Sequence, residues 1–146
     1  MSFNNLRFSL VLLLAFAAFP YPSYAGGPPG QAVLNGQKVL TLISRDPPGI
    51  RCNNNMQVAA ELSNLYKVPV QVIPAAFAGP GAKAPAVYYG DQLIAVDEGE
   101  LNGMVSFSQI ADILEIESVP KQEQQGRLME VKKDFDNLKA AIKAGN

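Results

Sequence analysis

Residues 38–73 alternate between two kinds of hydrophobic pattern. Residues 38–44 form a nearly continuous run of strand-forming residues, which predicts a strand buried on both faces. Apolar residues then recur at helical spacing over 53–67, and a second strand is predicted over 68–73. A strand, a helix and a second strand in this order imply a right-handed crossover that joins two parallel strands.

The next stretch predicts a hairpin followed by a helix. Two apolar runs, 85–89 and 93–96, flank Gly90-Asp91, a dipeptide typical of hairpin turns. Helical spacing returns over 106–116, with Ser106 as its N-cap. The pattern therefore predicts an α/β domain with a central mixed four-stranded sheet flanked by helices.

The C-terminal extension, 118–146, differs in composition from the domain at 38–117. Residues 121–143 are charged and rich in Gln, and they predict an amphipathic helix. Its apolar positions are spaced by three and four residues, as in a heptad seam: Leu128, Val131, Phe135, Leu138 and Ile142. This helix either packs its stripe on its own domain or pairs with a partner or a second copy of the chain.

The N-terminus has the features of an export signal. Arg7 precedes a short apolar run, 8–19, and Ser23-Tyr24-Ala25 supplies small residues for cleavage. We therefore expect a cleaved signal peptide over 1–25, an extended leader over 26–37 and a periplasmic location. After cleavage no stretch is long and apolar enough for a membrane span.

Charge and composition narrow the function. The chain has 12 basic and 13 acidic residues, one Cys and no His. With this balance the chain has no excess of positive charge with which to bind nucleic acid. Without His, and with a single Cys, we expect no metal site and no cofactor.

Cys52 is the residue on which the chemistry depends. It follows a predicted strand and a Pro-Pro-Gly turn, and it lies close to the start of the predicted helix. A helix N-terminus favours a thiolate, and Arg51 beside it would add to this effect. The alternative is an inert Cys in the core, because free Cys is among the most buried residue types.

These elements resemble the thioredoxin-like superfamily over about residues 38–116. Cys52 falls at the second Cys of the family's Cys-x-x-Cys motif, and Ala84-Pro85 before the hairpin looks like the family's cis-proline. The resemblance implies a minimal, glutaredoxin-sized core in which this proline lies beside the redox turn.

The departures from the family concern the redox chemistry. Gly49 replaces the nucleophilic Cys, and Pro48 replaces the Trp that commonly precedes it. Ile43 stands where thioredoxins often bury a carboxylate. The link from the second strand to Pro85 is short, so the helix expected there is reduced to about one turn.

Two functions remain open at this stage. The first is an exported binding or assembly module, for which we expect the binding residues Gly49, Ile50, Arg51, Ala84 and Pro85. The second is a single-thiol disulfide oxidoreductase or thiol carrier, in which Cys52 is catalytic and forms a mixed disulfide with a protein partner. Arg51 is alternatively a solvated surface charge, and a homodimer is compatible with both functions.

Overall fold

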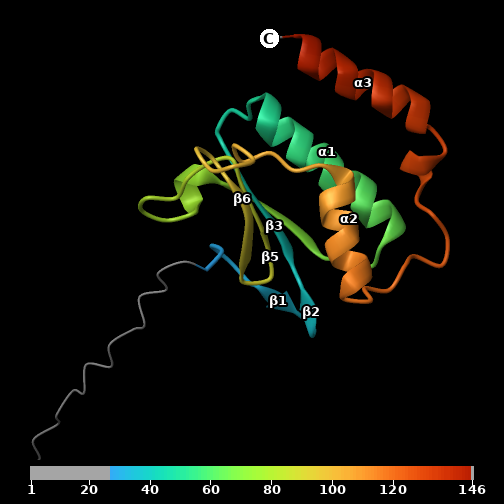
Figure 1. The fold of residues 1–146 in the computed structure, drawn as a ribbon, viewed down its shortest axis with the longest axis horizontal. Coiled ribbons are helices and arrows are strands. Elements are labelled where there is room, and N and C mark those ends of the chain that lie inside the picture. The colour runs from blue at the N-terminus through green and yellow to red at the C-terminus, as the bar shows by residue number, and fades with distance from the viewer. Residues whose placement is uncertain (1–26, 146) are drawn as a thin grey trace, which may run out of the picture.

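The computed structural model describes residues 27–145. The expected signal peptide, 1–25, lies outside the described residues. The remainder folds into a four-stranded sheet, a two-stranded ribbon, three α-helices and two 3₁₀ turns (Figure 1). In chain order these are β1 (Val33–Leu34), β2 (Gln37–Lys38), β3 (Leu40–Ser44), α1 (Ile50–Leu65), β4 (Val70–Pro74), η1 (Ala75–Phe77), β5 (Ala86–Tyr89), β6 (Gln92–Val96), α2 (Phe107–Ile116), η2 (Arg127–Met129) and α3 (Lys132–Ala144).

The central sheet has the order β4-β3-β5-β6. Strands β3 and β4 are parallel, whereas the pairs β3–β5 and β5–β6 are antiparallel. The prediction of an α/β domain with a mixed four-stranded sheet is therefore confirmed. The arrangement is compatible with the thioredoxin-like fold that the resemblance implies.

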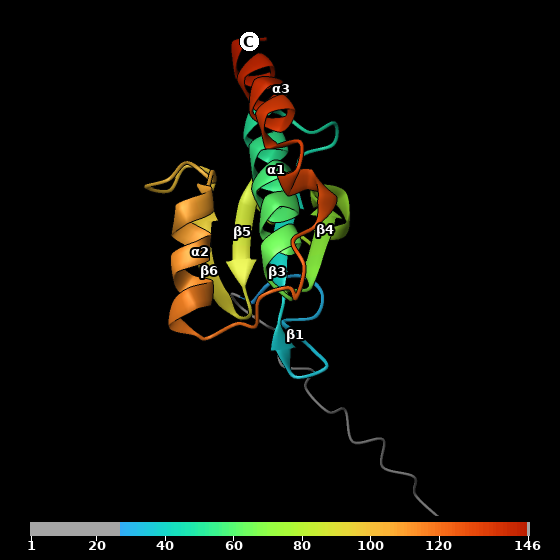
Figure 2. The same cartoon turned by 90° about the vertical axis from the view of Figure 1, so that its right-hand side faces the viewer.

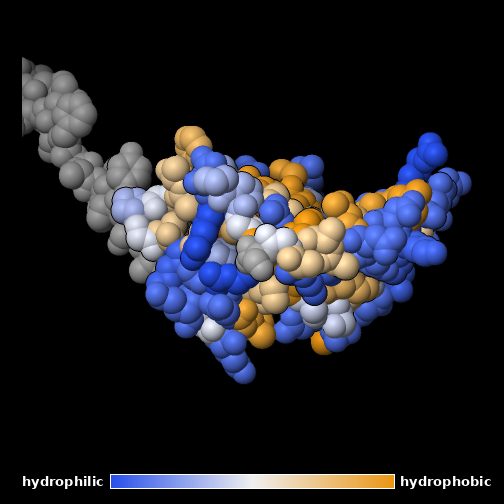
Figure 3. All heavy atoms as spheres, turned by 90° about the horizontal axis from the view of Figure 1, so that it is seen from above, coloured by the Kyte–Doolittle hydropathy of each residue, from blue (hydrophilic) through white to orange (hydrophobic). Residues whose placement is uncertain are grey.

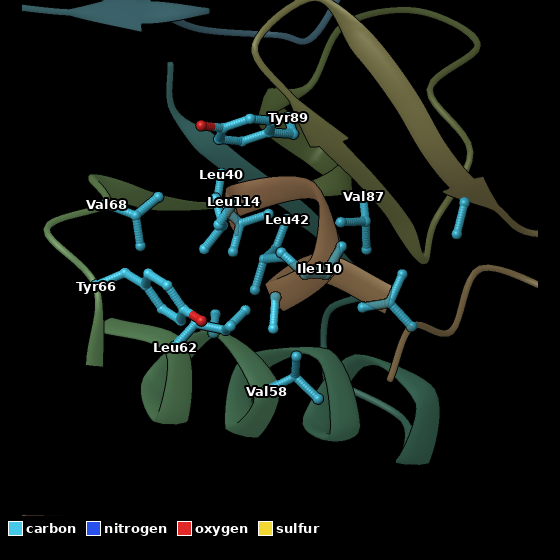
Figure 4. Close-up of a cluster of buried hydrophobic side chains, with 14 residues drawn as sticks. Leu40, Leu42, Val58, Leu62, Tyr66, Val68, Val87, Tyr89, Ile110 and Leu114 are labelled. Carbon is cyan, nitrogen blue, oxygen red and sulfur yellow. The ribbon is translucent and has the colours of Figure 1, made fainter. Parts of the chain in front are cut away.

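The hydrophobic core lies between one face of the sheet and helices α1 and α2 (Figures 2 and 4). Alternate strand residues point to this face, because successive side chains of a strand project to opposite sides. Its buried members include Leu40, Leu42, Val58, Leu62, Tyr66, Val87, Tyr89, Ile110 and Leu114. Helix α2 begins with the predicted capping box, in which the Ser106 side chain accepts a hydrogen bond from the backbone N–H of Gln109.

The opposite face of the sheet is covered by irregular chain. The side chain of Gln71 donates to Thr41 Oγ1 at 2.6 Å and to the carbonyl of Gln31 at 2.9 Å. Gly30 lies against the side chains of Gln71 and Ile73. Between β4 and Pro85 the only helical element is the single turn η1, as predicted. The leader thus takes part in the fold and is more than an extended tail.

Several predicted boundaries differ from the structure: β4, for example, spans Val70–Pro74 rather than 68–73. Helix α1 begins at Ile50 rather than at residue 53, because Gly49 is extended and its carbonyl accepts the first helical bond from Asn53 at 2.9 Å. This places Cys52 within the first turn. The first strand begins at Leu40, and Gln37–Lys38 pairs instead with Val33–Leu34 in the small ribbon.

The prediction of one helix over 121–143 is wrong for its first part. The backbone there binds the end of α1: Lys67 donates to the carbonyl of Pro120 at 2.7 Å, and Gln122 donates to that of Leu65 at 2.9 Å. Gly126 packs so closely on Asn64 that a Cβ atom would overlap the amide oxygen of that side chain. Tertiary hydrogen bonds therefore replace helical ones before η2 and α3.

None of the helices within 27–145 is long and apolar enough to cross a membrane.

Candidate binding cleft at the start of α1

A cleft of about 400 Å³ opens where β3 ends and α1 begins. The Ala84–Pro85 peptide bond beside it is cis, as predicted. Four of the five expected binding residues line this cleft together with Cys52. The fifth, Ala84, does not line it, but its carbonyl accepts a hydrogen bond from the side chain of Arg45, which does. The lining residues are Arg45, Gly49, Ile50, Arg51, Cys52 and Pro85.

Cys52 forms the inner wall of the cleft and is only 3% exposed. Its Sγ accepts a hydrogen bond from the backbone N–H of Arg45 at 3.3 Å. Gly49, three residues earlier, is exposed, and nothing lies within 4 Å of the point where a Cβ atom would be. The exposed position three residues before the thiol therefore has no side chain, whereas the thiol itself is buried.

Two arginines share one carboxylate at the edge of the cleft. Asp97 Oδ2 accepts from Arg45 Nη2 at 2.7 Å, and Asp97 Oδ1 accepts from Arg51 Nη1. The hydrogen bond from Arg51, reinforced by the one from Arg45, lowers the pKa of Asp97 against the opposing effect of burial. Arg45 also donates from Nε to the carbonyl of Ala84 at 2.9 Å. These contacts link the end of β3, the first turn of α1 and the cis-proline.

Arg51 is held more firmly than a solvated surface charge. Its side chain is 27% exposed, and Nη1 also donates to Asn102 O at 2.6 Å and to Asn102 Oδ1 at 2.7 Å. The interpretation of Arg51 as a solvated charge is therefore wrong. Sequence reasoning missed Arg45, Asp97 and Asn102 because their contacts join residues about 40 to 50 positions apart.

Two buried asparagines of α1 position the loop that carries Asn102. Asn55 Nδ2 donates to the carbonyl of Gly103 at 2.7 Å, and Asn55 Oδ1 accepts from the N–H of Val105 at 3.0 Å. Asn54 Nδ2 donates to the carbonyl of Val105 at 2.8 Å. The sequence signal for this role was a run of asparagines at positions where the helical pattern requires burial.

The predicted seam of the C-terminal helix is divided in the structure. Helix α3 lies against α1 (Figures 1 and 2), and Lys132 Nζ pairs with the buried carboxylate of Glu61 at 2.8 Å. Val131 and Leu138 are 50% and 54% exposed, respectively. The other seam residues, Leu128, Phe135 and Ile142, are half-buried. Packing on the chain's own domain and pairing with a partner or a second copy therefore both remain available. The half-buried seam residues suit the first use, and the exposed ones suit the second.

The surface at this end of the molecule is mixed. Seen from above, hydrophobic and hydrophilic atoms are interspersed, with no single apolar patch over the whole face (Figure 3). In the described part of the chain, no group of three or more His, Cys, Asp or Glu side chains is placed to hold a metal ion.

Comparisons with protein-family models, with curated proteins and with solved structures gave no match to this chain.

Proposed function

We propose that this chain is an exported, periplasmic protein of thioredoxin-like fold that binds a protein partner and carries out no thiol turnover of its own. The partner would engage the cleft formed by Arg45, Gly49, Ile50, Arg51 and Pro85. The protein would act by holding a segment of its partner in place rather than by changing its covalent structure.

The burial of Cys52 carries this proposal. Disulfide exchange requires an accessible thiolate to attack and a second thiol, internal or external, to release the mixed disulfide. Cys52 is 3% exposed, and the exposed position three residues earlier is Gly49. Ile43, also buried, offers no carboxylate to accept a proton. The burial of the thiol, the lack of a nucleophilic side chain at Gly49 and the lack of a proton acceptor at Ile43 all disfavour thiol turnover.

The rigidity of the cleft supports a binding role. Its walls are joined by the pairing of Arg45 and Arg51 with Asp97, and the adjoining loop is fixed by Asn54 and Asn55. A surface that is already ordered loses little conformational entropy when a ligand binds.

A single-thiol carrier acting through Cys52 is the second candidate. One contact favours it: the backbone N–H of Arg45 donates to Sγ at 3.3 Å, so a hydrogen-bond donor already lies beside the sulfur at the start of α1. Transfer would then require a local opening that exposes the sulfur. A covalent homodimer through Cys52 requires the same opening.

Helix α3 offers a second surface for a partner or another copy of the chain. Of the five predicted seam residues, only Val131, which precedes α3 as its N-cap, and Leu138 are at least half exposed. This surface is therefore smaller than the seam predicted from the sequence.

Site-directed photo-crosslinking in the native cells tests the proposal. A benzoylphenylalanine at Gly49 fits without steric conflict, because the space beyond its Cα is open. Asp91, exposed in the β5–β6 turn, is the matched control position. We expect a protein adduct from position 49 and none from position 91, and we expect the same adduct when Cys52→Ala is added.

Two results would contradict the proposal. Loss of the adduct in the Cys52→Ala background would favour the thiol carrier. Equal adducts from positions 49 and 91 would show that the cleft is not the binding surface.

A further inference from the structure

Arg51 leaves one edge of its guanidinium unused. All its hydrogen bonds come from Nη1, which donates to Asp97 and Asn102. Within residues 27–145, neither Nε nor Nη2 of Arg51 donates to a protein acceptor. These two nitrogens form a planar edge that matches the two oxygens of a carboxylate.

The same side chain is held in place beside the cleft. Arg51 lines the cleft, is 27% exposed and is fixed through Nη1 on three acceptor atoms. A mobile surface arginine would lose much of its rotamer freedom when it binds a ligand. Here most of that freedom is already lost, so the free edge is preorganised.

Arg45, Arg51 and the carboxylate that they share carry together one positive charge in excess. Arg45 and Arg51 both pair with Asp97, which is the one carboxylate within 4 Å of either guanidinium among the described residues. The first turn of α1 contains no acidic residue, and Gly49 supplies no side-chain cap. The N–H groups of this turn add positive potential on the same side.

We propose that the cleft binds a carboxylate of its partner, held by Nε and Nη2 of Arg51. The carboxylate belongs to an acidic side chain or to the C-terminus of a peptide. This inference rests on the proposed binding function and names the chemistry of its ligand. Gly49, Ile50 and Pro85 supply an apolar wall for the chain that carries the carboxylate.

A carboxylate fits the cleft better than a phosphate does. A phosphate monoester carries a charge of about −1.5 to −2 near neutral pH, whereas a carboxylate carries a single charge. One excess positive charge balances a carboxylate and leaves a phosphate only partly neutralised. The apolar wall also favours a group borne on a hydrocarbon chain.

An NMR titration of the isotope-labelled protein tests the inference. The probe is N-acetyl-L-leucine, and its uncharged amide is the matched control. We expect saturable shifts of the amides of residues 49–52 and of Arg51 Nε, with a Kd on the order of 1 mM, and no such shifts with the amide. Inorganic phosphate is the third probe, and we expect it to bind more weakly than the acid.

Variants separate the guanidinium edge from its charge. Arg51→Lys keeps the charge and removes the two-pronged edge, so we expect it to weaken binding of the acid about tenfold. Arg127→Lys is the matched control, because Arg127 is 95% exposed in η2 and does not line the cleft, and we expect it to leave the binding unchanged.

The inference is overturned if the acid and the amide give equal shifts, if phosphate binds more tightly, or if Arg51→Lys binds as well as the wild type. The comparison of acid with amide uses the unaltered protein, so it holds even if a variant fails to fold. These failures are distinct from failure of the proposed function, which a native, reactive Cys52 would overturn whether or not the acid binds.

Discussion

Asn55 is a buried polar residue that holds the loop at 103–105 next to the cleft. Its side chain is 2% exposed and satisfies two backbone groups of the loop, the carbonyl of Gly103 at 2.7 Å and the N–H of Val105 at 3.0 Å. Asn55→Ala would leave both groups buried without their partner. Because each unsatisfied buried group costs about 1–3 kcal/mol, we expect a loss of about 3 kcal/mol in the free energy of unfolding.

Asn53→Ala is the matched control. Asn53 lies in the same turn of α1, is half-buried and makes no side-chain hydrogen bond within residues 27–145. Alanine has the higher helix propensity, so this change should be neutral or slightly stabilising. Urea denaturation followed by circular dichroism measures both variants. If they differ by less than about 0.5 kcal/mol, the hydrogen bonds of Asn55 do not stabilise the loop as argued.

Two further predictions concern packing and ionisation. Gly103 has φ +72°, and a Cβ there would overlap the carbonyl oxygen of Pro85. Gly81 has a similar φ of +77° but open space around it, so Gly103→Ala should cost at least about 1 kcal/mol more than Gly81→Ala. Urea denaturation of both variants checks this difference, and equal losses would show that the close approach to the cis-proline costs nothing. The hydrogen bond from Tyr66 to Glu115 Oε1 at 2.7 Å, with burial, raises the pKa of Tyr66 to about 12. Because this pKa exceeds the unfolded value of about 10, the contribution of Tyr66 to stability is complete below about pH 10 and is lost as the pH rises towards 12. Tyr66→Phe should remove a tyrosine that ionises near pH 12 from the absorbance titration, and an unchanged titration curve would contradict the assignment.

The sequence was most informative where local pattern and burial agree. The four strands of the central sheet, the hairpin at Gly90 and the capping box at Ser106 were predicted, because each depends on a few neighbouring residues. The cis-proline at Pro85 was expected from the resemblance to the thioredoxin-like superfamily, and the small β1–β2 ribbon was not predicted. The position of Cys52 near the start of α1 was predicted for the same reason.

The polar network of the cleft could not be predicted in this way. The pairing of Arg45 and Arg51 with Asp97 joins segments about 50 residues apart, and no periodicity marks it. The helical spacing places Asn54 and Asn55 on the buried face of α1, but it does not identify the loop at 103–105, which supplies their hydrogen-bond partners.

The C-terminal extension shows the same limit. A heptad pattern identifies an apolar stripe but does not say which part of it another element covers. In the structure, the segment before α3 hydrogen-bonds to the end of α1. Gln122 donates to Leu65 and Lys67 donates to Pro120, so this segment cannot continue as one helix with α3. Only the folded domain determines that Leu138 stays exposed while Phe135 is half-buried.

The central claim is that Cys52 is a buried structural residue beneath a binding cleft. The most direct test is the rate of its alkylation in the native protein from about pH 5 to 9, compared with the rate after denaturation and with the intact mass of untreated protein. We predict slow labelling in the native state at every pH, rapid labelling after denaturation and no mass added to Cys52. Rapid native labelling that begins well below the ordinary thiol pKa, or a mixed disulfide on the untreated protein, would contradict the account and favour the thiol carrier.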